Sequence, residues 1–261
     1  MENEQMIRQK IRVLFEYRQI PWLLEQSQIS DKAEFLNALV ELQIAIYNLD
    51  HQLETKWDIQ LPDLKSYWVE IYRQLENMGL SPNQQRTWTG EIVRYQNREL
   101  DLRLGKSPLR YDMDDLYAFK SCDVRLMRRL IYCLDLFLNE KLKFSEWTEF
   151  DLITEVNDDV EDIYEDLSSL NGNRFLFSLH ELGMEETRNL YEQFINKHFD
   201  AATQRLTNSN SVFRAFMMDW LSAIVSQTLS MLDDRLRAID IDHINGATII
   251  RYYEQAKVAT T

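Results

Sequence analysis

Apolar residues along this chain recur at spacings of three and four positions, which is the period of an α-helix. Two clear stripes run through Leu42, Ile46, Leu49 and Leu53, and through Val156, Val160, Ile163 and Leu167. The alternating pattern of a strand and the short turns of a β-hairpin are absent from the sequence. The pattern therefore predicts an all-α helical bundle of about eight to ten helices.

Glycine and proline mark the expected helix ends, because the chain has only six Gly and four Pro. They lie at Pro21, Pro62, Gly79, Pro82, Gly90, Gly105, Pro108, Gly172, Gly183 and Gly246. The interval 109–171 lacks both residues and predicts helices over roughly 113–141 and 147–170, with a break near Phe144 and Ser145. The interval 184–245 predicts two more helices, with a break near Asn208–Ser211.

The composition is that of a folded protein with a sizeable core, since 45% of the 261 residues are apolar and 11% are aromatic. No stretch is polar or flexible enough to be an interdomain linker. We therefore expect residues 1–261 to form a single domain.

The chain is acidic, with 43 Asp and Glu against 29 Lys and Arg and a net charge of −14. Such a surface repels a polyphosphate backbone, so nucleic acid is not an expected partner. The acidic excess is as compatible with cation binding as with plain solubility. Charge alone therefore does not predict a metal site.

Cysteine usage and hydropathy indicate a cytoplasmic protein. Cys122 and Cys133 have neither redox nor zinc-ligand spacing, and we expect both to be buried thiols. No transmembrane segment is expected, because the apolar run from Leu130 to Leu138 is short and contains Asp135. A peripheral membrane contact and a homodimer are both compatible with this composition.

The segment 155–166, EVNDDVEDIYED, contains seven carboxylates in twelve residues. Pairs spaced by four positions in it include Asp158/Asp162, Glu161/Glu165 and Asp162/Asp166. Each such pair destabilises a helix by roughly 0.2–0.5 kcal/mol. A bound cation would offset this repulsion, whereas the alternative interpretation is an acidic face exposed to solvent.

A second acidic pair lies about a hundred residues earlier. Asp50 and Glu54 are one helical turn apart, and each directly follows a residue of the first apolar stripe. Both carboxylates are therefore expected at the rim of a buried face. Magnesium prefers oxygen ligands and often needs only one or two carboxylates beside a substrate phosphate.

These residues resemble the class I isoprenoid (terpenoid) synthase superfamily, an all-α fold in which two acidic motifs bind Mg²⁺ and a prenyl diphosphate. The second motif of that family is similar to Asn157, Asp158, Glu161 and Glu165. In the squalene and phytoene synthase branch, the matching positions are instead Asp158, Asp162, Glu165 and Asp166. Asp50 and Glu54 are similar to the first acidic motif of that branch.

The resemblance also suggests residues for the diphosphate. Arg251 and Tyr252 are similar to the C-terminal Arg-Tyr pair of bacterial terpene synthases, and Arg110 lies near the position of their diphosphate-sensing Arg. Lys120 and Arg125 lie in a largely apolar helix, and Arg174 follows Gly172. Basic groups there suit either phosphate oxygens or ion pairs with the acidic helices.

The resemblance thus implies an enzyme of transferase or lyase type that ionises a prenyl diphosphate. Its Mg²⁺ ligands would be Asp50, Glu54, Asn157, Asp158, Glu161, Asp162 and Glu165. The rival hypothesis is a non-catalytic helical relative that binds a prenyl lipid or another protein. Two features favour the rival: Glu161 replaces the family's Ser or Thr, and the first motif has no doubled Asp.

Overall fold

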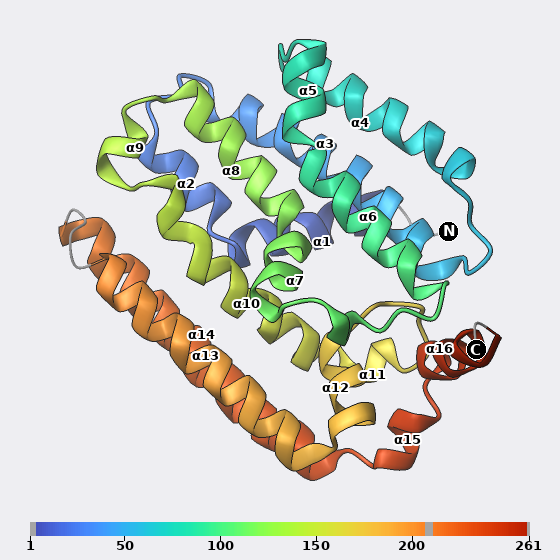
Figure 1. Cartoon of the computed structure of the whole chain (residues 1–261). Coiled ribbons are helices and arrows are strands. Elements are labelled where there is room, and N and C mark those ends of the chain that lie inside the picture. Colours follow the sequence, from blue (N-terminus) through green and yellow to red (C-terminus); the bar gives the residue numbers. More distant parts are fainter. Residues whose placement is uncertain (1–3, 207–210, 260–261) are drawn as a thin grey trace. The chain divides into compact units, whose positions relative to one another are not determined.

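The computed structural model describes residues 4–206 and 211–259. Within these ranges the chain forms sixteen α-helices and three short 3-10 helices, and no strand (Figure 1). This confirms the all-α prediction. The helices gather in two compact units, one spanning Met1–Gln96 with Cys122–Glu140 and the other Asn97–Ser121 with Lys141–Thr261. The prediction of a single domain stays a prediction.

The first unit is built on α3 (Lys32–Thr55), which packs against α1, α2, α4 and α8. The first apolar stripe lies on this helix, and all four of its residues are buried. The remaining elements of this unit are α1 (Glu4–Tyr17), α2 (Ile20–Gln26), η1 (Leu61–Leu64), α4 (Lys65–Asn77), α5 (Pro82–Trp88), α8 (Cys122–Leu134), α9 (Leu138–Lys141) and the first part of α6 (Gly90–Leu102).

The second unit is built on α10 (Thr148–Glu161), which packs against α7, α12, α13 and α14. Val156, Val160 and Ile163 of the second stripe are fully buried. The other elements of this unit are η2 (Pro108–Arg110), α7 (Met113–Lys120), η3 (Phe144–Trp147), α11 (Ile163–Asp166), α12 (Arg174–Leu182), α13 (Met184–Leu206), α14 (Ser211–Ala238), α15 (Ile241–Asn245), α16 (Thr248–Ala259) and the end of α6.

The predicted number of helices was too low because several long helical patterns are interrupted by polar residues. The predicted helix over 113–141 breaks at Ser121 and again at Asp135, whose carboxylate accepts the backbone N–H groups of Phe137 and Leu138. The predicted helix over 147–170 breaks at Asp162 and ends at Asp166. At Asp135, a side chain that bonds to nearby backbone competes in this way with the helical hydrogen bonds.

The prolines were expected where helices stop, but in the structure they lie where helices begin. All four prolines lie in the first turn of a helical element, where the missing N–H needs no partner. The interval 184–245 contains α13 and α14, which lie side by side (Figure 1), and the additional short α15. Most of the break predicted near Asn208–Ser211 lies outside the described residues.

Two predictions about apolar character had different outcomes. No helix among the described residues is long and apolar enough to cross a membrane. Cys122 is buried as predicted, but Cys133 is exposed, so its predicted burial is wrong. Ile131 and Asp135, which lie two residues before and after Cys133, are buried, but Cys133 between them faces away from the core.

Candidate functional site

The inner face of α10 carries carboxylates as well as apolar residues. Asp151, Glu155 and Asp159 follow one another at four-residue spacing, and each is at most 6% exposed. Their neighbours Asp158 and Asp162 are among the residues predicted from sequence, whereas Asp159 is not. The four-residue repeat among buried positions is the signal that would have identified it.

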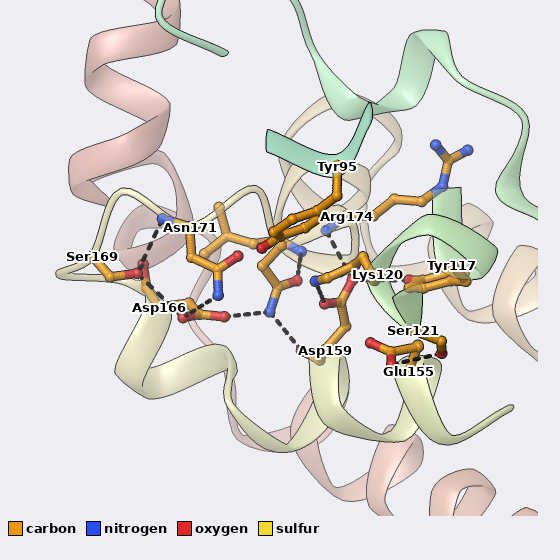
Figure 2. A network of polar contacts seen from close by, with 12 residues as sticks. Tyr95, Tyr117, Lys120, Ser121, Glu155, Asp159, Asp166, Ser169, Asn171 and Arg174 are labelled. Carbon is orange, nitrogen blue, oxygen red and sulfur yellow. Dashed lines mark hydrogen bonds and ion pairs between the residues drawn. The ribbon is translucent and has the colours of Figure 1, made fainter. Parts of the chain in front are cut away.

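Asp159 is the centre of a buried hydrogen-bond network (Figure 2). Its Oδ2 accepts the Tyr117 hydroxyl at 2.9 Å and the Arg174 backbone N–H at 2.9 Å. Its Oδ1 forms an ion pair with the Lys120 ammonium. The carboxylate therefore joins α7, α10 and the start of α12.

Lys120 keeps its charge in this buried position. Burial alone would lower the pKa of Lys120, but attraction to Asp159 and Glu155 outweighs it and raises the pKa above the usual value. A buried charge without a partner would cost several kcal/mol, on the order of 3–5 when a partner is removed. Lys120 and Asp159 thus stabilise each other as ions.

Tyrosine and serine side chains extend this network. The Tyr117 and Tyr191 hydroxyls lie 2.9 Å apart, and burial raises the pKa of both tyrosines. The Ser121 hydroxyl donates to Glu155 at 2.7 Å from the point where α7 ends. Because both phenols stay protonated, one of them donates to the other, and the network has a fixed direction of donors.

The loop after α11 wraps around the carboxylate of Asp166. The amide of Asn173 donates to Asp166 at 2.8 Å and to the backbone oxygen of Asp159 at 2.7 Å. Ser169 and Asn171 each donate to Asp166 at 3.2 Å (Figure 2). Burial nevertheless raises the pKa of Asp166. Asn173 thereby connects this loop to α10.

Three aspartates follow one another across the break between α10 and α11. The Asp162 backbone N–H donates to the Asp158 carbonyl at 2.9 Å, and the Asp166 N–H donates to the Asp162 carbonyl at 2.9 Å. Asp158, Asp162 and Asp166 therefore lie at successive turns, and we call them the carboxylate ladder. The structure retains their predicted spacing although the helix is interrupted.

The middle position of the ladder is electrostatically unfavourable for a carboxylate. Partial burial and the neighbouring Asp166, Glu165 and Glu161 raise the pKa of Asp162 to about 6, and Lys120 opposes this shift. The residue Asp162 as a whole is nonetheless exposed, as are Glu161 and Glu165. Negative charge thus exceeds positive charge around Asp162, which is the condition that a bound cation relieves.

Arg235 was not anticipated from the sequence. It lies on α14, and its guanidinium donates to the Glu161 carbonyl at 3.1 Å and to the Val160 carbonyl at 3.4 Å. The same group lies 4.9 Å from the centre of the Tyr164 ring. Arg235 therefore caps the carboxyl end of α10, where a cation interacts favourably with the helix dipole.

The predicted diphosphate-binding residues of the second unit lie in different surroundings. Arg174 is buried, and its guanidinium donates to the Pro108 carbonyl at 2.8 Å and the Tyr111 carbonyl at 3.1 Å. Arg110 is exposed on η2. Arg251 and Tyr252 are exposed on α16.

The helix that carries Arg251 begins next to the ladder. The Thr248 N–H, at the start of α16, donates to the carbonyl of Leu167 at 2.8 Å, and Leu167 directly follows Asp166. A loop-to-helix hydrogen bond thus holds this end of α16 at the end of the ladder. The structure therefore brings the start of α16 to the end of the ladder. Lys120 is instead paired with Asp159, and Arg174 points its guanidinium at η2.

The remaining predicted residues belong to the first unit. Asp50 is half-buried and accepts the Tyr95 hydroxyl at 2.8 Å, and Glu54 is half-buried one turn later. Arg125 lies 3.5 Å from the Glu91 carboxylate. The rim position of Asp50 and Glu54 agrees with the expectation. The meeting of this pair with the ladder of the second unit stays a prediction.

Asn157 has a structural partner. Its side chain is fully buried, and its amide donates to the Thr228 hydroxyl at 2.7 Å where α10 packs against α14. No group of three or more His, Cys, Asp or Glu side chains is placed for metal binding within residues 4–206 and 211–259. The ladder supplies only oxygen donors, which suit Mg²⁺ when water and phosphate complete its shell.

Comparison with protein-family models, curated proteins and solved structures finds no match to this chain.

Proposed function

We propose that this chain binds Mg²⁺ and a prenyl diphosphate at the carboxylate ladder and ionises the diphosphate, as an enzyme of the class I isoprenoid synthase type. The observation that carries the proposal is the ladder itself, in which Asp158, Asp162 and Asp166 occupy successive turns with an excess of negative charge. The motif resemblance described above identifies the same segment. A metal ion bound there would relieve the repulsion.

The donor set is compatible with Mg²⁺. Asp158 is half-buried and Asp162 is exposed, so their oxygens are accessible to a hydrated ion. Glu165 is exposed beside them. Bound Mg²⁺ neutralises negative charge on a departing diphosphate. Transfer, condensation and cyclisation are all reactions of an allylic cation, and the proposal does not choose among them.

Residues of the chain itself would orient the anion. The ammonium of Lys120 carries a permanent positive charge near Asp162 and Asp166. Arg251 lies one turn into α16, the helix that begins beside Leu167. Cations placed around a diphosphate stabilise charge that develops as the carbon–oxygen bond breaks.

Thermal unfolding tests the proposal. Mg²⁺ with farnesyl diphosphate should raise the melting temperature more than either alone, because a ligand at a hundredfold excess over its Kd adds about 2.7 kcal/mol. The double substitution Asp158→Asn with Asp162→Asn should abolish this joint shift. Glu76→Gln with Asp200→Asn removes two exposed charges elsewhere and should preserve it.

The ionic strength must be matched in all samples, because simple screening also stabilises a chain with a net charge of −14. A shift that sodium chloride reproduces in full would contradict the proposal. So would a joint shift that survives the double substitution at the ladder.

The non-catalytic alternative is favoured by one observation. Asp159, Lys120 and Asn157 are already satisfied by internal partners, so the buried network holds the fold together without a ligand. A protein of this kind would bind farnesol as well as farnesyl diphosphate and would show no dependence on Mg²⁺. Diphosphate release, measured with a phosphate-coupled assay, distinguishes the enzyme from this alternative.

A further inference from the structure

Three exposed apolar side chains lie close together where α8 ends and the chain turns into α9. Leu134, Leu136 and Phe137 are 59%, 77% and 59% exposed. No other four consecutive positions among residues 4–206 and 211–259 expose three large apolar side chains. Exposed apolar residues that cluster, unlike those scattered singly, mark surfaces that another molecule covers.

The turn that carries these side chains is fixed by the buried carboxylate of Asp135. This carboxylate accepts the backbone N–H groups of Phe137 at 3.0 Å and of Gln28 at 2.8 Å. Figure 1 shows the turn next to α2, whose end precedes Gln28. A side chain held on a fixed backbone loses less entropy on binding a partner, so this turn is suited to recognition.

A groove of about 310 Å³ adjoins the turn, and Leu134 is one of its walls. Asp31, Phe35 and Ala38 line it from the start of α3, at the spacing of four and three positions that places them on one helical face. Met78, at the end of α4, lines the opposite side. The groove is therefore formed by two helices that pack against each other, and its walls are largely apolar.

The polar edge of the groove is acidic. Asp31 and Glu34 line it and are both exposed. In the described part of the chain, the residues that line the groove include no lysine or arginine. The ammonium of the neighbouring Lys32 binds the Glu25 carbonyl at 2.8 Å and the Glu25 carboxylate at 3.2 Å. The charge at this edge therefore favours a cationic partner.

We propose that this groove and the α8–α9 turn together form a docking surface for an amphipathic helix of a partner protein, with lysine or arginine along the edges of its apolar face. A groove between two helices accepts such a helix through apolar side chains spaced by three and four positions. Half of the lining residues are exposed, so the groove is open, whereas a small-molecule site buries most of its ligand.

The acidic edge also selects among possible occupants. A second copy of this chain carries a net charge of −14 and would be repelled, whereas a basic helix would be attracted. The docking surface belongs entirely to the first unit. This inference therefore goes beyond the proposed function and does not depend on it.

The test uses the full chain and a synthetic helical peptide as the probe. The peptide has leucine at positions i, i+3, i+4 and i+7, lysine along the edges of this face, and about 18 residues, which is long enough for a helix to form. Fluorescence anisotropy measures the Kd, and hydrogen exchange locates the peptide. We expect protection at the start of α3 and at the α8–α9 turn. A peptide with glutamate in place of lysine should bind about 10-fold more weakly or not at all.

Two leucines of equal exposure provide matched variants. Leu134 and Leu104 are both 59% exposed, but Leu104 belongs to the second unit and does not line the groove. Leu134→Gln should weaken binding of the lysine peptide by about 10-fold, as the loss of an anchoring side chain does. Phe137→Ser should have a similar effect, and Leu104→Gln should have none. All three positions are exposed, so the variants should keep the fold.

The acidic edge has its own matched pair. Glu34 and Glu186 are both exposed and both occupy the third position of a helix, in α3 and α13. Glu34→Gln should slow association and weaken binding by about 2- to 5-fold at low salt, which is the effect of one exposed charge pair. Glu186→Gln should do neither. Asp31 is left intact, because its carboxylate accepts the Glu34 N–H at 3.0 Å and caps α3.

Several results would overturn the proposal. The lysine peptide might fail to bind at about 1 mM, which corresponds to a free energy near −4 kcal/mol, or it might bind Leu134→Gln as tightly as the natural chain. A dimer of the chain that Phe137→Ser dissociates in sedimentation experiments would assign the surface to a second copy. Binding to phosphatidylcholine vesicles that Phe137→Ser abolishes would assign it to a lipid surface. None of these results bears on the carboxylate ladder, which lies in the second unit.

Discussion

The Asn157 amide donates to the Thr228 hydroxyl at 2.7 Å, which joins α10 to α14 inside the second unit. Thr228 in turn donates to the Ile224 carbonyl on its own helix at 2.8 Å. Both side chains are fully buried. A residue whose sequence context resembles a metal-ligand motif is therefore part of the contact between two helices.

We predict that Asn157→Ala lowers the free energy of unfolding by about 1–3 kcal/mol, because it leaves a buried polar group without its partner. Urea denaturation measures this loss. Thr228→Val should cost a similar amount, and the double variant should cost less than the sum, since the two residues contact each other. Mg²⁺ affinity should not change. A loss of Mg²⁺ binding without a loss of stability would instead support a ligand role for Asn157.

Gly105 is a position where the backbone requires glycine. Its φ is +69°, and a Cβ there would lie 2.9 Å from the backbone nitrogen of Lys257 and 3.1 Å from the backbone carbon of Ala256. Gly105→Ala should therefore displace α16 as well as strain the turn. We expect a loss greater than the roughly 1–2 kcal/mol that a left-handed backbone alone costs, with faster hydrogen exchange along α16.

Gly79→Ala is the matched control. Gly79 also has a positive φ, of +84°, but apart from the adjoining residues nothing lies within 4 Å of the position that a Cβ would take there. This variant should show only the conformational cost, and α16 should keep its protection. Equal losses of unfolding free energy in the two variants would show that the close contact between Gly105 and α16 is not what requires glycine at this position.

The pKa of Asp162, raised from its usual 3.8 to about 6, predicts a specific pH dependence. Between these two values the folded state binds more protons at this residue than the unfolded state, so its contribution to stability falls as the pH rises through this window. The unfolding free energy of the natural chain minus that of Asp162→Asn should therefore fall from about pH 4 to about pH 6 and stay constant above. The natural chain thus loses stability relative to the variant as the pH rises.

Carbon-13 NMR of the Asp162 carboxyl tests the same point directly. We expect a titration midpoint of about 6 without metal. Saturating Mg²⁺ with pyrophosphate should lower the midpoint, because a metal ion favours the ionised carboxylate. A midpoint near 3.8 without metal would show that the ladder is not crowded with negative charge.

The sequence predicted the helices of this fold better than it predicted their interruptions. The stripes on α3 and α10 follow from local periodicity. The prolines mark the boundaries between helices, although they lie in first helical turns and not at the helix stops where they were expected. The breaks at Ser121 and Asp162 do not. They depend on side chains that bond across the unit, as Ser121 does with Glu155, or that repel acidic neighbours, as Asp162 does.

The ladder could be predicted from sequence, because Asp158, Asp162 and Asp166 are close along one chain segment. The network around Asp159 could not. Its members come from α7, α10, α12 and α13, and only the packing of these helices brings Tyr117, Lys120 and Tyr191 together. Adjacent positions on a helix differ by about 100°, so Asp158 and Asp159 have separate surroundings.

Asp135 interrupts the apolar run that ends α8, and the structure explains its presence there. Its side chain is 4% exposed. One carboxylate oxygen accepts the N–H groups of Phe137 at 3.0 Å and Leu138 at 3.2 Å, and the other accepts the N–H of Gln28 at 2.8 Å. Asp135 therefore fixes the loop between α8 and α9 and ties it to the end of α2.

These contacts predict a graded loss of stability. Asp135→Asn keeps one acceptor oxygen, which can still bond to Phe137 and Leu138, and loses the bond to Gln28. Asp135→Ala leaves the N–H groups of Gln28 and Phe137 without this acceptor, whereas Leu138 keeps its hydrogen bond to the carbonyl of residue 135 at 3.2 Å. We expect the Asn variant to lose about 1–2 kcal/mol of unfolding free energy and the Ala variant more, since each unsatisfied buried group costs about 1–3 kcal/mol. Hydrogen exchange at Gln28 should quicken in both variants, whereas exchange at Phe137 should quicken only in the Ala variant. Equal exchange at Phe137 in the two variants would contradict the assignment of separate oxygens to the two sides of the loop.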